Sequence, residues 1–196
     1  MSEQDPTATM AGMIFPFTAK RLFESRTILI VGEINNQTAE RVVSQLLSLS
    51  AESKEPIRLF IHSNGGHVES GDTIHDMIKF VEPKVIMVGT GWVASAGTHI
   101  YLAAEKENRY CLPQTRFMIH QPLGGIGGRA VDIQIEAEEI LKARERLNKT
   151  IADATGQPIA KVRKDTDRNF WMSPEEARDY GIVGKIVSCA ADLPNA

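Results

Sequence analysis

The sequence has little cysteine and no long hydrophobic run. Only two of the 196 residues are cysteines, Cys111 and Cys189, and both lie in apolar surroundings. A disulfide framework is therefore not expected, and a reducing cytoplasm is the default location. No apolar run approaches the roughly 20 residues of a membrane-spanning helix. The acidic, polar start, MSEQDP, lacks the basic and apolar regions of a secretory signal. The sequence thus predicts a cytoplasmic protein without a membrane segment.

Charge of one sign is also scarce. The formal net charge is −3, and the lysines and arginines form no stripe that could follow a phosphate backbone. No two of the five histidines have a zinc-ligand spacing with a third ligand. The glycines at 124–128 lack the Lys-Ser or Lys-Thr that follows a phosphate-binding loop. Nucleic acid, metal and nucleotide are therefore not expected as ligands.

Apolar strand-like runs alternate with helix-like segments along the first half of the chain. Strands are predicted at 27–31, 57–61 and 85–88, and helices at 38–49, 68–81 and 95–104. This alternation, with 42% hydrophobic and 24% charged residues, predicts one α/β domain with its functional loops at the strand ends.

Two further helices are predicted nearer the C-terminus. The longer one spans about 130–154 and has one apolar stripe interrupted by Arg144. Such a stripe suits a helix that packs on its own core or one that projects and contacts another chain. The shorter one begins with a capping box at Ser173 and Glu176, with Pro174 at its first position, and Gly181 can end it.

The strongest functional signal is a serine among small residues at 91–97 (GWVASAG). A strand leads into this segment and a helix follows it, so Ser95 is expected at the junction. An oxyanion formed beside Ser95 would meet the unpaired N–H groups and the positive dipole end of that helix. The alternative is a serine that only caps the helix.

Three other segments could complete a catalytic site. His120 follows a strand-like run at 117–119, and an imidazole there could activate a serine hydroxyl. Gly65 and Gly66 follow another strand, where the backbone can approach a ligand or simply turn. The segment 164–173 (KDTDRNFWMS) mixes acidic, basic and amide groups with bulky apolar residues and could supply a third group.

Together these segments resemble the family of ClpP, the self-compartmentalising serine peptidase that is the proteolytic subunit of the Clp protease. The resemblance spans about 22–187 and rests on ASAG at 94–97, RFMIHQPLGG at 116–125 and DTDR at 165–168. It implies an α/β fold of the crotonase-like ββα superhelix type with a protruding handle helix. The implied parts are a flexible axial segment at 1–17, a protease domain at 18–190 with its handle at about 123–156, and a C-terminal tail at 191–196.

The resemblance also implies a role for each matching residue. Ser95 corresponds to the nucleophile, His120 to the general base, Asn169 to the third triad member, and the amides of Gly66 and Ala96 to the oxyanion hole. The other matching positions are Gly124, Gly125 and Ile126 for peptide binding, Asp167 and Arg168 for contacts between rings, and Phe60, Phe80 and Tyr110 for ATPase docking. No metal or organic cofactor is implied, because ATP is used by the partner.

The third triad position departs from the family pattern. The family usually has aspartate there, whereas this chain has Asn169, which can orient an imidazole but carries no negative charge. In a trypsin-type triad the change from Asp to Asn lowers turnover about 10⁴-fold through the wrong histidine tautomer. Asp165 and Asp167 are alternative candidates for the orienting role. In addition, Asn64 replaces a common proline and Ala96 a common methionine, so cleavage preference is not inherited from the family.

The implied activity is hydrolysis of peptide bonds in unfolded proteins delivered by an AAA+ unfoldase of the ClpX or ClpA type. The implied assembly is a tetradecamer of two stacked heptameric rings joined by their handles, built from this chain alone or mixed with a second ClpP paralogue. Asn169, and a start that lacks the usual axial-loop sequence, favour an alternative: a weakly active or regulatory paralogue that works only in a mixed complex. A crotonase-fold acyl-CoA enzyme is a further alternative, which the motifs at Ser95 and His120 disfavour.

Overall fold

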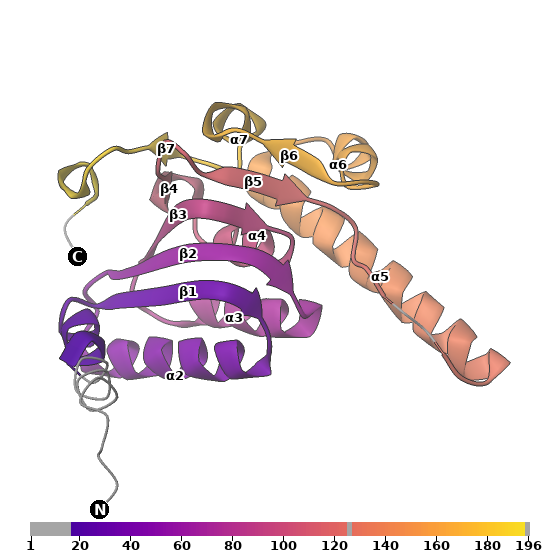
Figure 1. The fold of residues 1–196 in the computed structure, drawn as a ribbon, viewed down its shortest axis with the longest axis horizontal. Coiled ribbons are helices and arrows are strands. Elements are labelled where there is room, and N and C mark those ends of the chain that lie inside the picture. The colour runs from indigo at the N-terminus through magenta and orange to yellow at the C-terminus, as the bar shows by residue number, and fades with distance from the viewer. Residues whose placement is uncertain (1–16, 125–126, 195–196) are drawn as a thin grey trace, which may run out of the picture.

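One seven-stranded sheet organises the computed structural model, which describes residues 17–124 and 127–194. The strands are β1 (Thr27–Ile34), β2 (Ile57–Gly66), β3 (Val85–Ala94), β4 (Arg109–Cys111), β5 (Arg116–Ile119), β6 (Phe170–Met172) and β7 (Lys185–Ile186). Their order is β1-β2-β3-β4-β7, while β5 pairs with the far end of β3 and carries β6 at its side. Every pair except β5 with β6 is parallel, and the long strands β1, β2 and β3 all end on the right in Figure 1.

Helices α2 and α3 cover one face of this sheet (Figure 1). The helices are α2 (Asn36–Glu52), α3 (Val68–Phe80), α4 (Ala96–Tyr101), α5 (Ala130–Thr155), α6 (Ile159–Asp165) and α7 (Pro174–Tyr180), with 3-10 turns at Lys106–Asn108 and Ala190–Asp192. Residues 17–24 are also helical. The buried residues of α2 are Ala39, Val42, Leu46 and Leu49, the spacing of a single helix face turned to the core.

The predicted alternation of strands and helices is confirmed, with different boundaries. Strand β3 continues from the predicted end at Val88 to Ala94, because Trp92, Val93 and Ala94 pair with the distant strand β5. The helix predicted at 95–104 is shorter and ends at Tyr101. The predicted capping box at Ser173 is confirmed, and Gly181 ends α7 in the left-handed conformation. Local sequence signals fixed these caps, whereas the length of β3 depends on a long-range pairing.

The long helix α5 has a packed part and a projecting part. Near its C-terminal end Asn148 and Ile151 are buried against the rest of the protein. Its N-terminal half extends away from the sheet (Figure 1), and there Val131 is 68% and Leu141 59% exposed. One part of the helix packs on the core while the other part projects, and contact of the projecting part with another chain stays a prediction.

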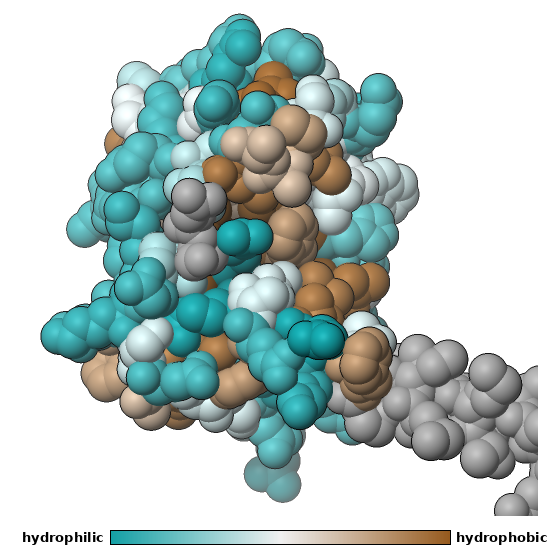
Figure 2. Space-filling model, turned by 90° about the vertical axis from the view of Figure 1, so that its left-hand side faces the viewer, coloured by the Kyte–Doolittle hydropathy of each residue, from teal (hydrophilic) through white to brown (hydrophobic). Residues whose placement is uncertain are grey.

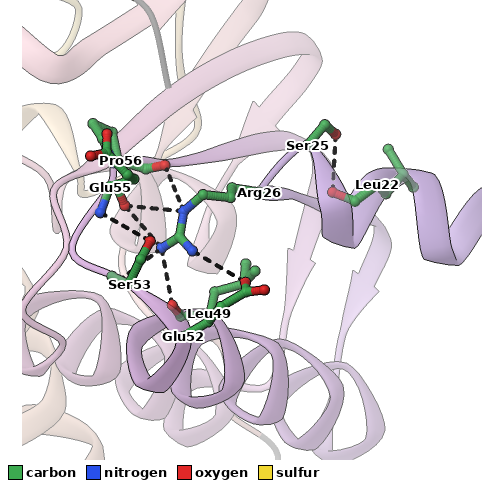
Figure 3. A network of polar contacts seen from close by, with 8 residues as sticks. All are labelled: Leu22, Ser25, Arg26, Leu49, Glu52, Ser53, Glu55 and Pro56. Atoms are coloured by element: carbon green, nitrogen blue, oxygen red, sulfur yellow. Dashed lines mark hydrogen bonds and ion pairs between the residues drawn. The ribbon is translucent and has the colours of Figure 1, made fainter.

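Arg26 fixes the point at which the N-terminal helical segment joins the sheet (Figure 3). Its guanidinium donates to the carbonyl oxygens of Leu49 at 3.0 Å, Ser53 at 3.2 Å and Glu55 at 2.9 Å. These carbonyls belong to the end of α2 and to the loop that leads into β2. A cation there satisfies carbonyls that the helix leaves unpaired and faces the negative end of its dipole.

The side of the molecule on which strands β1, β2 and β3 begin faces the viewer in Figure 2. Hydrophobic residues gather down the middle of this face, between hydrophilic ones at its margins. Phe80, at the end of α3, is 76% exposed.

Among the described residues, no helix combines the length and the apolar character needed to cross a membrane. Cys111 and Cys189 are both free thiols, and burial raises the pKa of Cys111 to about 12.

Candidate active site

Ser95 lies in a strained turn between β3 and α4. Its φ of 56° and ψ of −122° put a residue with a side chain in a region that such residues rarely adopt. The side chain makes no cap hydrogen bond to α4, so the capping role is not what the structure shows. Strain of this kind is typical of functional sites, where surrounding contacts hold one residue in place.

Two neighbours hold this turn. The Thr98 hydroxyl lies 2.7 Å from the carbonyl oxygen of Val93 and 2.9 Å from that of Met118, which also accepts from the Ser95 amide at 2.9 Å. Gly65 packs directly against the serine, because a Cβ at this position would lie 2.6 Å from the Cβ of Ser95. No role was predicted for Thr98 from the sequence, although a hydroxyl residue about one helical turn after the candidate nucleophile could have indicated one.

His120 connects the serine to Asn169. Its Nε2 lies 2.8 Å from the Ser95 hydroxyl oxygen, and its Nδ1 lies 3.0 Å from Oδ1 of Asn169. His120 directly follows β5, and Asn169 directly precedes β6, so the antiparallel pairing of these strands brings the two side chains to the same end. The three residues proposed for the triad are thus in contact in one chain.

The orientation of the Asn169 amide decides the histidine tautomer. An amide oxygen only accepts, so an Oδ1 facing Nδ1 requires the proton on Nδ1. The lone pair of Nε2 then faces the Ser95 hydroxyl, as a general base requires. With the amide reversed, Nδ2 would donate to Nδ1 and place the proton on Nε2, which is the unproductive tautomer.

Gln121 joins the loop of His120 to the loop of Asn169. Its backbone N–H donates to the carbonyl oxygen of Thr166 at 2.6 Å, and its Nε2 donates to that of Asp167 at 2.8 Å. Thr166 is itself buried, where its hydroxyl donates to Oδ1 of Asn148 in α5 at 2.8 Å. Neither Gln121 nor Thr166 was predicted from the sequence, since their contacts join segments about 45 residues apart and follow no recognisable spacing.

The two aspartates considered for the orienting role bind other groups. Asp165 pairs with Lys161 and accepts from the Tyr180 hydroxyl at 2.9 Å. Asp167 pairs with Arg144 at 3.2 Å and with Arg168 at 3.5 Å. Neither carboxylate faces His120 in this chain, so the Nδ1 contact belongs to Asn169.

A small, largely apolar pocket opens beside Ser95 and His120. Its other lining residues are Val68, Ala96, Thr98, His99, Ile119, Pro122, Leu147 and Ile151. Its walls therefore come from α4 on one side and from the packed end of α5 on the other. A pocket in this place, next to a nucleophile, suits one apolar side chain of a substrate.

The residues predicted for the oxyanion hole are close to Ser95 in the chain or in space. Ala96 is the first residue of α4, and amides in the first turn of a helix have no partner within it. Gly66 follows Gly65 at the end of β2, and only glycine fits there, because a Cβ would lie 2.2 Å from the carbonyl oxygen of Ile34. Their role as oxyanion donors stays a prediction.

The predicted peptide-binding residues are only partly described. Gly124 packs against α5, where a Cβ would lie 2.6 Å from Cδ1 of Ile140. Gly125 and Ile126 lie outside the described residues. Gly124, Gly127 and Gly128 form no strand in the single chain, and pairing of this segment with a bound peptide stays a prediction.

The residues predicted for ATPase docking come from two places. Phe60 and Tyr110 both pair with Val88 and so lie in one row across the sheet. Phe80 ends α3, which together with α2 covers one face of the sheet.

No group of three His, Cys, Asp or Glu side chains within 17–124 and 127–194 has the arrangement of a metal site.

Comparisons with known proteins point to one family. The sequence model described as Clp protease matches residues 14–190. A relative named ATP-dependent Clp protease proteolytic subunit 3, from Rhizobium etli, is 60% identical over 176 residues, which cover 90% of this chain and 91% of the relative. Proteolytic subunit 2 from Pseudomonas aeruginosa is 52% identical over 162 residues, covering 83% of this chain and 81% of that protein.

Solved structures give the same result. ClpP1 from Listeria monocytogenes has a TM-score of 0.82 and 57% sequence identity, covering 90% of this chain and 99% of that chain. An Asn-to-Asp mutant of the same Listeria protein has a TM-score of 0.85 at 58% identity, with the same coverage. The predicted fold class is confirmed by these similarities.

Proposed function

The chain belongs to the Clp protease family, and we propose that Ser95, His120 and Asn169 carry out its peptide hydrolysis. The family and the named relatives make it a ClpP-type proteolytic subunit and a serine endopeptidase. The assignment of the reaction to these three residues rests on the continuous contact from Ser95 through His120 to Asn169.

In the proposed reaction Ser95 attacks the scissile carbonyl while its proton moves to Nε2 of His120. The amides of Gly66 and Ala96 donate to the oxyanion of the tetrahedral intermediate. His120 then gives its proton to the leaving amine, which breaks the peptide bond and leaves an acyl group on Ser95. A water molecule, deprotonated by His120, hydrolyses this ester and restores the serine.

Asn169 fixes the imidazole rather than stabilising its charge. Its Oδ1 holds the proton on Nδ1, which is the geometric part of the role that an aspartate plays. Being neutral, it gives no ion pair to the imidazolium that forms during attack. We therefore propose a working but slow enzyme, since one of the two contributions is present.

The test is peptidase activity of the purified protein on a panel of short fluorogenic peptides. Turnover by the protein alone that is lost in Ser95→Ala would support the assignment. Silence of the protein alone, with activity in Asn169→Asp, would contradict it.

A second candidate function is supported by the neutral Asn169. In it, the chain is a weakly active or regulatory subunit that works in a mixed complex with a second ClpP paralogue. Activity that appears only after mixing with a second ClpP-like subunit from the same cell, and that survives Ser95→Ala in this chain, would favour it.

We propose an assembly of two stacked heptameric rings with an AAA+ unfoldase of the ClpX or ClpA type as the ATP-using partner. The relatives' names include "ATP-dependent", and the projecting apolar half of α5 supports contacts between rings. Asp167 and Arg168 are proposed for contacts between rings, and Phe60, Phe80 and Tyr110 for the ATPase. The substrates are unfolded polypeptides, no cofactor is required in the subunit, and the free thiols support a cytoplasmic location.

A further inference from the structure

Behind the pocket beside Ser95, one carboxylate bridges two helices. Asp72 of α3 lies with Oδ1 2.9 Å from Nε2 of His99 in α4, and its Oδ2 accepts from Nη2 of Arg146 in α5 at 2.5 Å. Gly71 allows α3 to come this close to α4, since a Cβ there would lie 3.3 Å from that of Ala96. The side chain of His99 is 8% exposed and that of Asp72 23%. The His99 end of the bridge is therefore shielded from solvent, whereas the side chain of Arg146 at the other end is 53% exposed.

Both partners of Asp72 are adjacent to the pocket walls. His99 itself lines the pocket, together with Ala96 and Thr98 of α4. Arg146 directly precedes Leu147, which with Ile151 forms the α5 wall. A single carboxylate thus contacts one residue from each of the two helices that form the pocket walls.

We propose that Asp72 is a positioning residue that fixes the width of the pocket beside Ser95, by holding His99 of one wall and Arg146 of the other. The inference rests on the proposed function, in which this pocket receives the side chain of the pre-scissile residue, the residue on the amino side of the cleaved bond. A pocket held narrow in this way excludes large aromatic side chains and accepts smaller ones.

The charges of the cluster support this role. Burial favours the protonated form of Asp72, but pairing with His99 and Arg146 outweighs it and lowers the pKa of this carboxyl below its usual value. His75 stacks on His99 with ring centroids 4.4 Å apart, and its Nδ1 donates to the His99 carbonyl oxygen at 2.9 Å. Burial lowers the pKa of His75, so this second imidazole supports the first without adding charge at neutral pH. Glu69 and Asp76 line the outer side of the same cluster.

The test compares pre-scissile preference in the Asp72→Asn variant, the wild type and a matched control. Fluorogenic peptides that differ only in carrying Ala, Leu or Phe at the pre-scissile position give kcat and KM separately. The proposal predicts that Asp72→Asn raises the Phe to Ala ratio of kcat/KM at least fivefold, mainly through KM. Arg146→Gln is predicted to act in the same direction. Asp76→Asn, one turn further along α3, removes a carboxylate that no hydrogen bond or ion pair among the described residues engages, and should leave the ratio unchanged.

A second measurement separates this proposal from the proposed function. Product peptides ending in Ala, Leu or Phe are titrated against Ser95→Ala, with and without Asp72→Asn, and their Kd values are compared. This measurement needs no turnover, so an inactive wild type would overturn the proposed function while the binding ratios still decide the role of Asp72. A Phe to Ala ratio of Kd values that changes less than twofold when Asp72→Asn or Arg146→Gln is added to Ser95→Ala, or an equal change when Asp76→Asn is added, would overturn the inference.

Discussion

The two sides of His120 are built differently. On the Nε2 side, Ser95 sits in a strained turn fixed by Thr98 and pressed against Gly65. On the Nδ1 side, Asn169 is an exposed, neutral amide whose position depends on two loops joined by Gln121. The position of the nucleophile is thus fixed by the backbone conformation and its close neighbours. The position of the orienting group depends on contacts between two loops and on the direction of one amide.

The largest expected effect is on the nucleophile side. Ser95→Ala removes the attacking oxygen and should lower turnover by roughly 10⁴-fold or more, as in other serine proteases. Its melting temperature should stay within a few degrees of wild type, because the strained backbone is unchanged. Turnover above one per cent of wild type in a folded Ser95→Ala protein would mean that another group is the nucleophile.

Gly65→Ala tests how tightly the serine is held. The new methyl group would lie 2.6 Å from the Cβ of Ser95, so the serine must move, and displacements of this kind cost about 10²-fold in turnover. Gly32→Ala is the matched control, since Gly32 also has a positive φ but has open space around it. Steady-state peptidase assays should show normal turnover in the control and only a loss of stability. Equal losses of turnover in both variants would attribute the effect to backbone strain alone.

Asn169→Asp adds the missing charge on the other side of His120. We expect a gain in kcat of about 10- to 100-fold, well below 10⁴-fold, because the amide oxygen already holds the productive tautomer. Asn169→Ala should fall below wild type in the same kinetic assay. A gain near 10⁴-fold would show instead that the wild-type amide points the other way in solution.

Gln121→Ala should weaken the junction of the two loops. It removes one hydrogen bond to the Asp167 carbonyl, worth about 1 kcal/mol, and should lower kcat about fivefold with little change in KM. Gln157→Ala removes a similar bond, to the Tyr180 carbonyl at 3.0 Å, at a distance from the site and serves as the control. Equal losses of turnover in Gln121→Ala and Gln157→Ala would show that the hydrogen bond of Gln121 has no specific role in the site.

The smallest expected effect is on stability and concerns His75, which stacks on His99 beside the pocket. Burial, with the nearby His99 and Lys79, lowers the pKa of His75 below 6.5, so the unfolded chain binds this proton first as pH falls. The free energy of unfolding should therefore decrease below about pH 6.5. His75→Gln should show a shallower fall in melting temperature between pH 7.5 and 5.5. An unchanged slope would mean that His75 contributes nothing to it.

Local signals predicted most of the secondary structure. The apolar runs of β1 and β2 and the Ser173 capping box depend on neighbours in sequence, so they can be recognised without a structure. The end of β3 cannot, since its pairing partner β5 lies more than 20 residues away. The role of α5 was left open for a similar reason: periodicity does not tell what a helix face contacts.

The site was predicted less completely. Ser95 and His120 were identified from their motifs, and Asn169 only through the family resemblance. The bridge from Asp72 to His99 and Arg146 joins three separate helices, and no spacing in the sequence indicates it. Contacts of this kind follow from the packing of the fold.

The most direct test of the account is the rate at which a small fluorophosphonate modifies Ser95, followed by intact mass. This reagent has no peptide part, so the rate depends on the activation of Ser95 by His120. We expect the wild type to react at least 10²-fold faster than His120→Ala and within about 100-fold of the rate of Asn169→Asp. A wild type as slow as His120→Ala, with a fast Asn169→Asp, would contradict it, because a neutral amide would then not support the base.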